Sequence, residues 1–421
     1  MVSLRKLSLL STTALVGLDS ARARFPRSND DPDLNTGRYI VILRDGLEAS
    51  AVEQHMHWAT SLRARDTSPT IELGMRWNIG SWNAYSCTMD GNTLAQINGS
   101  DAVKLVEPDS RIDLFRHITQ ENASWGLGSI SHRGRVNRTD YVYDSRAGEG
   151  TYAYILDTGL LATHEEFEGR ASLGYNAVGG RFVDEVGHGT HVAGTLGGKT
   201  YGVAKKAKII SVKIFAGYRS SVSNLLQGFE WAVGNITGEN RQKNSVISIS
   251  AGGEAREAVN QAVNEAYNQG ILTVVAAGNA DQDAQHFSPA SAENAITVGS
   301  VGRNDSRSIF SNWGQLVDIF APGESIESAW IGDNQDTRNL SGTSMSTPHI
   351  SGLLLYLKSI IPYRMETPVD SLKELQQLAT HGVVRDIRGS KNLLGFNGNG
   401  ETVLANGRAP VIYNLDHTAS N

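Results

Sequence analysis

A serine that could act as a nucleophile, Ser344, occurs in one chain with two side chains that could activate it for acyl transfer, Asp157 and His188. A serine hydroxyl is a weak nucleophile, so a neutral imidazole must take its proton as it attacks a carbonyl carbon. A buried carboxylate must in turn fix the tautomer of that imidazole and stabilise the imidazolium. Because Asp, His and Ser follow one another here in one of the chain orders known for such hydrolases, these residues predict acyl transfer with Ser344 as the nucleophile.

The segment around Ser344 has the composition of a turn that leads into a helix. Small residues fill Ser341–Thr347. Pro348 is tolerated near a helix start because first-turn N–H groups have no partner within the helix. Those N–H groups and the positive end of the helix dipole would stabilise an oxyanion next to Ser344. Taken alone, the segment is equally typical of a serine-rich helix cap without a catalytic role.

The elements that must position these residues begin at Thr151, where apolar segments start to alternate with helical ones. This pattern predicts βαβ units, and hence an α/β fold with a parallel sheet covered by helices on both faces. The predicted strands are Tyr152–Leu156, Lys208–Phe215, Val246–Ser250, Ile271–Ala276, Ile296–Val298 and Leu316–Phe320, and the predicted helices lie near His188–Gly197, Val222–Val233, Arg256–Asn268 and Ser344–Ile360.

Three polar or glycine-rich segments close predicted strands of this sheet. Asp157 closes the first strand, residues 251–253 close the third, and Asn279 follows the fourth. Sites in open parallel sheets form beyond the carboxyl ends of the strands, so we expect all three at one edge. The side-chain amide of Asn279 could there donate a hydrogen bond to a developing oxyanion.

A smaller unit precedes the large domain, from about Arg24 to Arg116. Its pattern predicts the order β-α-β-β-α-β, which is that of a small α+β ferredoxin-like domain. The predicted elements are Tyr39–Leu43, Glu48–Arg63, two strands within Arg76–Met89, Asn92–Ile97 and Val103–Val106. The polar run Glu107–Arg116 is typical of a linker, and we place the domain boundary there. This order of elements says nothing by itself about function.

Three motifs in the large domain resemble those of the subtilases, in particular secreted fungal subtilisins of the proteinase K type. They are the runs Ile155–Gly159, His188–Gly194 and Gly342–Pro348, and Ala276–Asn279 resembles the segment with the family's oxyanion asparagine. The resemblance implies a subtilisin-like fold, Ser344 as nucleophile, His188 as general base and Asp157 as the carboxylate that orients it. The oxyanion hole would be the Asn279 side chain and the Ser344 N–H group. The implied substrate-binding residues are Ser250, Ala251, Gly252, Gly253, Ala276, Ala277 and Gly278.

The same resemblance implies that the first unit is an inhibitory and folding-assisting propeptide of an autoprocessed zymogen. The expected organisation is then a signal peptide over residues 1–23, a propeptide over 24–116 and a peptidase domain over 117–421. Protein or peptide substrates and the propeptide itself are the expected partners, and we expect a monomer.

A structural calcium ion is a further expectation from the resemblance. Asp318, with the backbone oxygens of Glu293 and Ala295, falls where the family has such a site, and oxygen ligands suit Ca²⁺. Asp318 could equally be a solvated carboxylate at the end of a strand. No organic cofactor is expected.

The first residues predict export from the cell. Arg5 and Lys6 precede an apolar run, Leu7–Leu18, and small residues follow it, as in a secretory signal peptide. No later segment is long and apolar enough for a membrane anchor, so we expect a secreted, extracellular protein. Sequons for N-glycosylation occur at Asn98, Asn122, Asn137, Asn235, Asn304 and Asn339.

Charge and cysteine content narrow the possible partners and sources of stability. A net charge of −6 and a pI of about 6.0 give no basic patch for nucleic acid, which we do not expect as a partner. The single cysteine, Cys87, excludes an intramolecular disulfide.

Other interpretations of the same motifs have weaker support. Asp157-Thr158-Gly159 is also the tripeptide of aspartic proteases, whose chemistry requires a second such tripeptide that this chain lacks. His188 and His191 have the spacing of two helical zinc ligands, but no Cys or Glu pattern completes that site. Ser344 lacks the second glycine of Gly-x-Ser-x-Gly, which disfavours an α/β-hydrolase elbow. A catalytically inactive binding protein with a subtilase fold remains an alternative.

Overall fold

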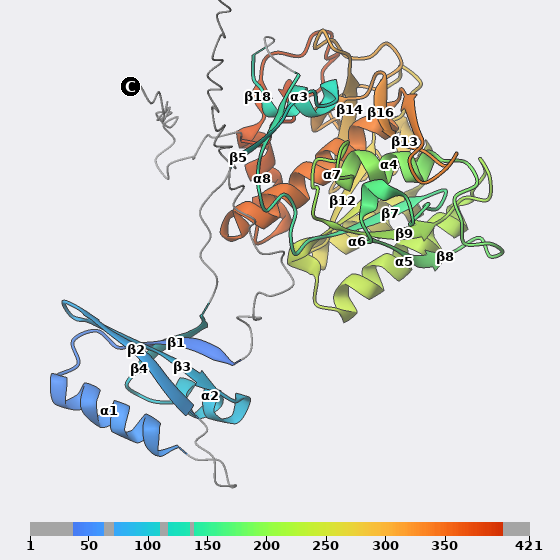
Figure 1. Cartoon of the computed structure of the whole chain (residues 1–421). Coiled ribbons are helices and arrows are strands. Elements are labelled where there is room, and N and C mark those ends of the chain that lie inside the picture. The colour runs from blue at the N-terminus through green and yellow to red at the C-terminus, as the bar shows by residue number, and fades with distance from the viewer. Residues whose placement is uncertain (1–36, 63–70, 110–116, 135–138, 399–421) are drawn as a thin grey trace, which may run out of the picture. The chain divides into compact units, whose positions relative to one another are not determined.

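The computed structural model describes residues 37–62, 71–109, 117–134 and 139–398 (Figure 1). The chain forms two compact units, Met1–Leu114 and Phe115–Asn421. The predicted signal peptide, the predicted boundary at Arg116 and the sequon at Asn137 lie outside the described residues. Among the helices described, none combines the length and the apolar character needed to cross a membrane.

The first unit has the predicted order of elements. Its strands form an antiparallel sheet in the order β2-β3-β1-β4. One core holds buried side chains from the sheet, such as Val41 and Tyr85, and from both helices, such as Met56 and Ile97, so the helices cover the same face. The bounds are β1 Arg38–Leu43, α1 Ala49–Ser61, β2 Ile71–Ile79, β3 Trp82–Met89, α2 Gly91–Asn98 and β4 Val103–Pro108.

The second unit is built on a nine-stranded sheet with the order β18-β19-β15-β14-β12-β10-β7-β9-β8. All neighbours are parallel except β18 and β19. This confirms the predicted α/β class. The strands are β7 Tyr152–Asp157, β8 Ala171–Asn176, β9 Lys208–Lys213, β10 Ser245–Ile249, β12 Leu272–Ala276, β14 Ile296–Val301, β15 Ile319–Pro322, β18 Thr380–His381 and β19 Leu393–Leu394.

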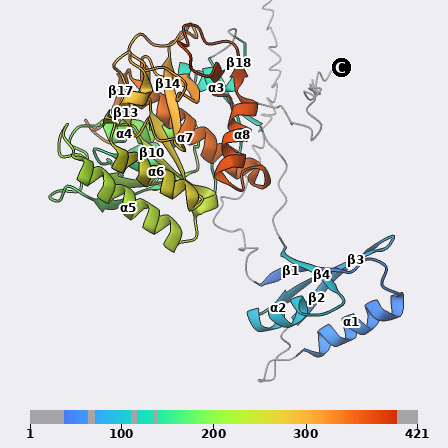
Figure 2. The ribbon, with the colours of Figure 1, turned by 180° about the vertical axis from the view of Figure 1, so that it is seen from behind.

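Helices cover both faces of this sheet, as Figures 1 and 2 show. Successive residues of a strand point to opposite faces, so Ala153 and Ile155 of β7 enter one core while Tyr154 and Leu156 enter the other. The first core also holds α4 (His188–Gly197) and α7 (Thr343–Ile360). The second core holds α5 (Val222–Gly238) and α6 (Glu257–Asn268).

Helix α7 is enclosed by the rest of the second unit over most of its length. All its residues from Met345 to Lys358 are buried, and it packs against α4 and against strands β10, β12, β14 and β15. Pro348 is the sixth residue of the helix and has no N–H group for the backbone oxygen of Ser344, which accepts a hydrogen bond from the Ser250 hydroxyl at 2.9 Å instead. The apolar run after Ser344 therefore anchors the predicted nucleophile in the centre of the unit.

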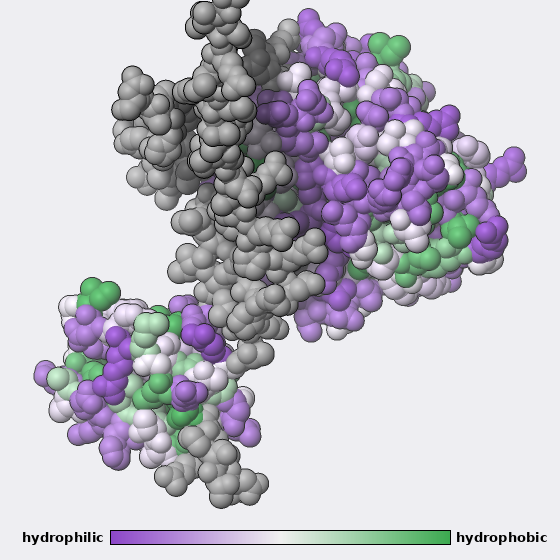
Figure 3. Space-filling model, viewed as in Figure 1, coloured by the Kyte–Doolittle hydropathy of each residue, from purple (hydrophilic) through white to green (hydrophobic). Residues whose placement is uncertain are grey.

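Shorter elements surround the sheet. Three antiparallel pairs lie outside it, β5–β6, β11–β13 and β16–β17. These strands are β5 His117–Gln120, β6 Tyr141–Asp144, β11 Gly253–Glu254, β13 Phe287–Ser288, β16 Ile326–Ala329 and β17 Thr337–Leu340; the remaining helices are α3 Trp125–Ser131 and α8 Pro368–Leu378, with 3₁₀ turns at Glu165–Phe167, Gln242–Asn244, Ala284–His286 and Pro362–Arg364. On the face seen in Figure 3, hydrophobic residues form small groups among hydrophilic ones.

Candidate active site

Asp157 and His188 meet at the carboxyl edge of the sheet. Asp157 is the last residue of β7, and His188 is the first residue of α4. The imidazole Nδ1 atom lies 2.7 Å from Oδ1 of Asp157, whose side chain is 1% exposed. Donation from Nδ1–H to this carboxylate leaves Nε2 as the proton acceptor of the ring. The pair thus has the geometry of a base and the carboxylate that orients it.

A second buried carboxylate, Asp184, holds the start of α4. It accepts hydrogen bonds from the N–H groups of Gly187 and Thr190 and from the hydroxyls of Thr158 and Thr190, at 2.7–2.9 Å. Burial raises the pKa of Asp184, but these hydrogen bonds outweigh it and leave the pKa below its usual value. Asp184 was not predicted from the sequence, although a carboxylate four residues before a Gly-flanked histidine was a signal for it.

The protonation of His188 reflects both neighbouring carboxylates. Burial lowers the pKa of His188, but the charge and hydrogen bond of Asp157, together with the charge of Asp184, outweigh it. The pKa therefore lies above the ordinary histidine value. The negative charges around α4 thus favour the imidazolium that a general base becomes when it takes a proton.

Ser344 is the second residue of α7 and contacts Ser250, the residue that follows β10. Strand β10 lies beside β7 in the sheet. Its hydroxyl donates to the backbone oxygen of Ser250 at 3.0 Å, and the Ser250 hydroxyl donates to the backbone oxygen of Ser344 at 2.9 Å. Strands β12, β10 and β7 are consecutive in the sheet, so the ends that carry Asn279, Ser250 and Asp157 are neighbours. The described contacts thus join Ser344 to Ser250 and His188 to Asp157.

The side chain of Asn279 is joined directly to the segment before Ser344. Its Oδ1 atom accepts hydrogen bonds from the backbone N–H and the hydroxyl of Thr343, both at 2.9 Å. The Thr343 hydroxyl also accepts from the N–H of Gly278 at 3.2 Å. Because both bonds use the oxygen, the Nδ2 group of Asn279 remains as the donor. Sequence reasoning did not single out Thr343 for this role.

The predicted substrate-binding residues fall into two groups. Ala251, Gly252 and Gly253 line a cavity of about 450 Å³, whose lining also includes Phe215 and Tyr218. These two residues follow β9, which ends at Lys213 and not at the predicted Phe215. The second group differs, because Ala276 and Ala277 are buried and Gly278 is hydrogen-bonded to Thr343.

His191 lies on the same helix as His188 but is fully buried. Its Nε2 atom lies 2.9 Å from the backbone oxygens of Ile326 and Arg338. Burial lowers its pKa to about 4, so it is neutral at neutral pH. Across the described ranges, no three His, Cys, Asp or Glu side chains gather into a possible metal site. These contacts fit a structural histidine.

The predicted calcium ligands fit a cation only in part. Oδ2 of Asp318 accepts from the N–H of Thr297 at 3.0 Å, so this carboxylate lies close to the chain just after Ala295. However, Oδ1 of Asp318 is 2.7 Å from the ammonium of Lys391. Carboxylate and carbonyl oxygens are suitable donors for Ca²⁺, but Lys391 already supplies the positive charge. The residues as they stand do not fit a calcium ion unless Lys391 moves away.

The five predicted glycosylation sites that are described differ in exposure. Asn98, Asn122, Asn304 and Asn339 are exposed. Asn235 lies within α5, and its side-chain oxygen accepts a hydrogen bond of 2.6 Å from the hydroxyl of Tyr154.

Comparison with known proteins agrees with this architecture. Residues 148–400 match the model of the Subtilase family, and residues 38–115 match that of Peptidase inhibitor I9. The chain is 50% identical over 376 residues to Alkaline protease 1 of Aspergillus flavus, which covers 87% of this chain and 93% of the relative. It is 46% identical over 413 residues to an alkaline proteinase of Hapsidospora chrysogena. That similarity covers 95% of this chain and 100% of the relative.

A solved structure has the same fold as the second unit. The crystal structure of a cold adapted subtilisin-like serine proteinase is similar with a TM-score of 0.61 and 39% sequence identity. The similarity covers 66% of this chain and 99% of that protein.

Proposed function

Because this chain belongs to the subtilase family and is a serine-type endopeptidase with an I9 inhibitor propeptide, we propose that Ser344, His188 and Asp157 hydrolyse peptide bonds of proteins. The observation that carries the proposal is the 2.7 Å contact between His188 and the buried Asp157, at the sheet edge that also bears Ser344 and Asn279. A buried carboxylate beside an imidazole prepares that ring to accept a proton.

The proposed reaction proceeds through an acyl-enzyme. The Ser344 hydroxyl leaves its hydrogen bond with Ser250 and gives its proton to Nε2 of His188 as Oγ attacks the scissile carbonyl carbon. Asn279 Nδ2 and the N–H of Ser344 stabilise the resulting oxyanion. His188 then protonates the leaving amine, and water, activated by His188, hydrolyses the acyl-enzyme. The carboxylate of Asp157 stabilises the imidazolium form of His188.

Substrate binding is proposed for Ser250, Ala251, Gly252 and Gly253, together with Gly278. Support comes from the cavity beside residues 251–253, whose lining also includes the apolar side chains of Phe215 and Leu225. Apolar walls with exposed backbone groups suit an extended peptide. Ala276 and Ala277 would act by shaping the chain beneath Gly278, since they are buried.

The first unit is proposed to inhibit the second and assist its folding until cleavage near Arg116 releases it. We also propose that residues 1–23 direct export, so that the mature enzyme is extracellular and monomeric. Glycans are proposed at the exposed sequons. Calcium at Asp318, Glu293 and Ala295 stays a prediction, and its binding requires displacement of Lys391.

The nucleophile is tested in the full-length chain with the substitution Ser344→Ala. We expect a folded precursor that is not cleaved near Arg116, whereas the wild-type protein matures and hydrolyses a chromogenic peptide until phenylmethylsulfonyl fluoride is added. N-terminal sequencing of the product locates the cleavage. Continued self-cleavage by the variant would refute the assignment of Ser344, and a matured wild-type protein without hydrolysis would favour a binding protein.

A further inference from the structure

The turn that carries Asn279 is held on both sides by one buried residue, Asn312, which lies in the loop before β15. The Oδ1 atom of Asn312 accepts from the N–H groups of Ala280 at 3.0 Å and Gln282 at 3.1 Å. Its Nδ2 group donates to the backbone oxygen of Ala277 at 2.8 Å. Its backbone N–H donates to the oxygen of Gly278 at 2.9 Å. Asn312 is fully buried, so water cannot replace these bonds.

The fit between Asn312 and this turn is close. Gly278 has a φ of +106°, and a Cβ atom added there would lie 2.4 Å from Nδ2 of Asn312. Only glycine allows both that backbone conformation and that approach. The Asn312 amide thus lies against the backbone of the residue immediately before Asn279.

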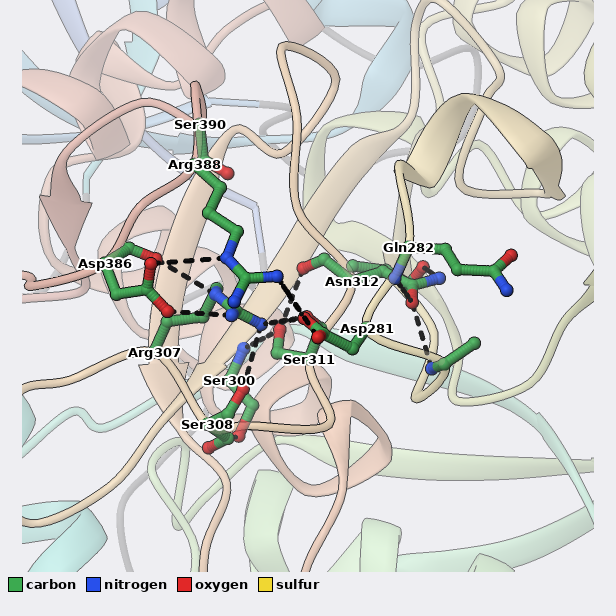
Figure 4. A network of polar contacts seen from close by, with 12 residues as sticks. Asp281, Gln282, Ser300, Arg307, Ser308, Ser311, Asn312, Asp386, Arg388 and Ser390 are labelled. Carbon is green, nitrogen blue, oxygen red and sulfur yellow. Dashed lines mark hydrogen bonds and ion pairs between the residues drawn. The ribbon is translucent and has the colours of Figure 1, made fainter.

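An ion-pair network holds the far end of the same turn, as Figure 4 shows. The carboxylate of Asp281 pairs with the guanidinium groups of Arg307 and Arg388, each at 2.9 Å. Arg307 also pairs with Asp386 at 2.8 Å and donates to the backbone oxygen of Ser311, next to Asn312. The network therefore ties the turn, the loop of Asn312 and the segment between β18 and β19 together.

The members of this network differ in how much they can contribute. The Arg307 side chain is 1% exposed. Removal of its carboxylate partners would leave a buried charge without compensation, which strongly destabilises a fold. Arg388 is 42% exposed, and surface pairs of this kind contribute little. The rigidity of the turn thus depends on Asn312 and Arg307 more than on Arg388.

We propose that Asn312, supported by Arg307, is a positioning residue that sets the oxyanion-binding amide of Asn279. The inference rests on the proposed role of Asn279. The oxygen of that amide is fixed by Thr343, whereas the backbone that carries it is fixed by Asn312. A donor stabilises an oxyanion only within a narrow range of distance, and small displacements of catalytic groups lower kcat strongly. Asn312 therefore acts on turnover through Asn279, without contacting the substrate.

A double-mutant cycle between Asn312→Ala and Asn279→Ala tests this inference on the matured enzyme. We expect Asn312→Ala to lower kcat for a chromogenic peptide by about 10–100-fold and to change KM by less than about threefold. In the Asn279→Ala background, the same substitution should lower kcat by less than about threefold, because the amide that it positions is already gone. Equal losses of kcat in both backgrounds, or a change in KM alone, would overturn the proposal.

Asn397→Ala is the matched control for a general loss of stability. Asn397 is also buried, and its Nδ2 group donates to the backbone oxygen of Val142 at 2.7 Å, away from the turn. We expect this variant to keep kcat within about twofold of wild type even where its melting temperature falls as far as that of Asn312→Ala. A loss of kcat in Asn397→Ala that matches its loss of stability would refute a specific role for Asn312.

A second variant covers the case in which Asn312→Ala does not mature. Asn312→Asp keeps the side-chain shape and the acceptors for Ala280 and Gln282, but places an oxygen against the oxygen of Ala277. It should lower kcat in the same direction, and an unchanged kcat would contradict the proposal. The role of Asn279 is judged separately: if Asn279→Ala alone leaves kcat unchanged in an active enzyme, the proposed oxyanion hole is wrong.

Discussion

Two buried carboxylates of the large sheet, Asp157 and Asp318, each lie 2.7 Å from a basic nitrogen, yet their surroundings differ in kind. The partner of Asp157 is an imidazole, which can lose and regain a proton near neutral pH. The partner of Asp318 is the ammonium of Lys391, whose side chain is 46% exposed. The same distance therefore joins a carboxylate to a titratable imidazole at one site and to an ammonium group at the other. What separates them is the chemistry of the base.

The largest difference should appear when each carboxylate is made an amide. Asp157→Asn should lower kcat by about 10⁴-fold, because the amide favours the wrong tautomer of His188. Asp318→Asn should leave kcat close to wild type and change only the melting temperature. Active-site titration followed by peptide hydrolysis measures both. Similar kcat losses in the two variants would break the comparison.

The pH dependence of the rate sharpens the comparison at His188. Because the pKa of His188 is raised, kcat/KM should begin to fall at a higher pH than it would with an ordinary histidine. Below the pKa of His188, kcat/KM should fall about tenfold per pH unit. Asp184→Asn removes one of the negative charges and should move this acid limb to lower pH. A pH profile of kcat/KM for both proteins is the measurement, and an unmoved limb would exclude Asp184 as a cause.

The raised pKa also has a consequence for folding. A group whose pKa is higher in the folded than in the unfolded state stabilises the fold below the unfolded pKa. The contribution of His188 to stability should thus be complete at low pH and disappear as the pH rises through its folded pKa. Unfolding of Ser344→Ala and of Ser344→Ala with His188→Gln, compared across pH, would show this as a difference that shrinks towards alkaline pH.

The smallest expected effect concerns Lys391. Lys391→Met should lower the free energy of unfolding by about 1 kcal/mol, since the ammonium is partly exposed to solvent. It should also free Asp318, so added calcium should raise the melting temperature more in this variant than in wild type. Thermal unfolding of inactive Ser344→Ala proteins measures both effects. Equal calcium responses in wild type, Lys391→Met and the double variant with Asp318→Asn would exclude binding at Asp318.

Sequence patterns predicted the parts of the fold that carry strong periodicity. Helix α4 has the predicted bounds, and the alternation of apolar strands with helices predicted the α/β class, because such strands are buried on both faces. Strand β8 was missed because it is an edge strand without a fully buried residue, with Gly174 and Asn176 instead of an apolar run. Strand β15 starts three residues later than predicted, because a turn from Gly314 to Val317 precedes it.

The predicted site residues were those with motif-like spacing, whereas the residues that support them were not found. Asn312 acts on backbone groups of a turn about 30 residues away, and such bonds leave no pattern in the sequence. The pair of Lys391 and Asp318 is likewise a product of tertiary structure, as β19 lies beside β15. Periodicity describes local structure, so contacts between distant loops require the fold itself.

The burial of α7 has a consequence for how the enzyme should lose activity on heating. Hydrogen exchange at a buried helix of this kind requires opening of the surrounding core, so its amides should be among the slowest to exchange. Ser344 is part of that helix, whereas Tyr218 belongs to an exposed loop. Heat should therefore loosen the cavity beside Tyr218 first, while Ser344 keeps its place until the whole domain unfolds.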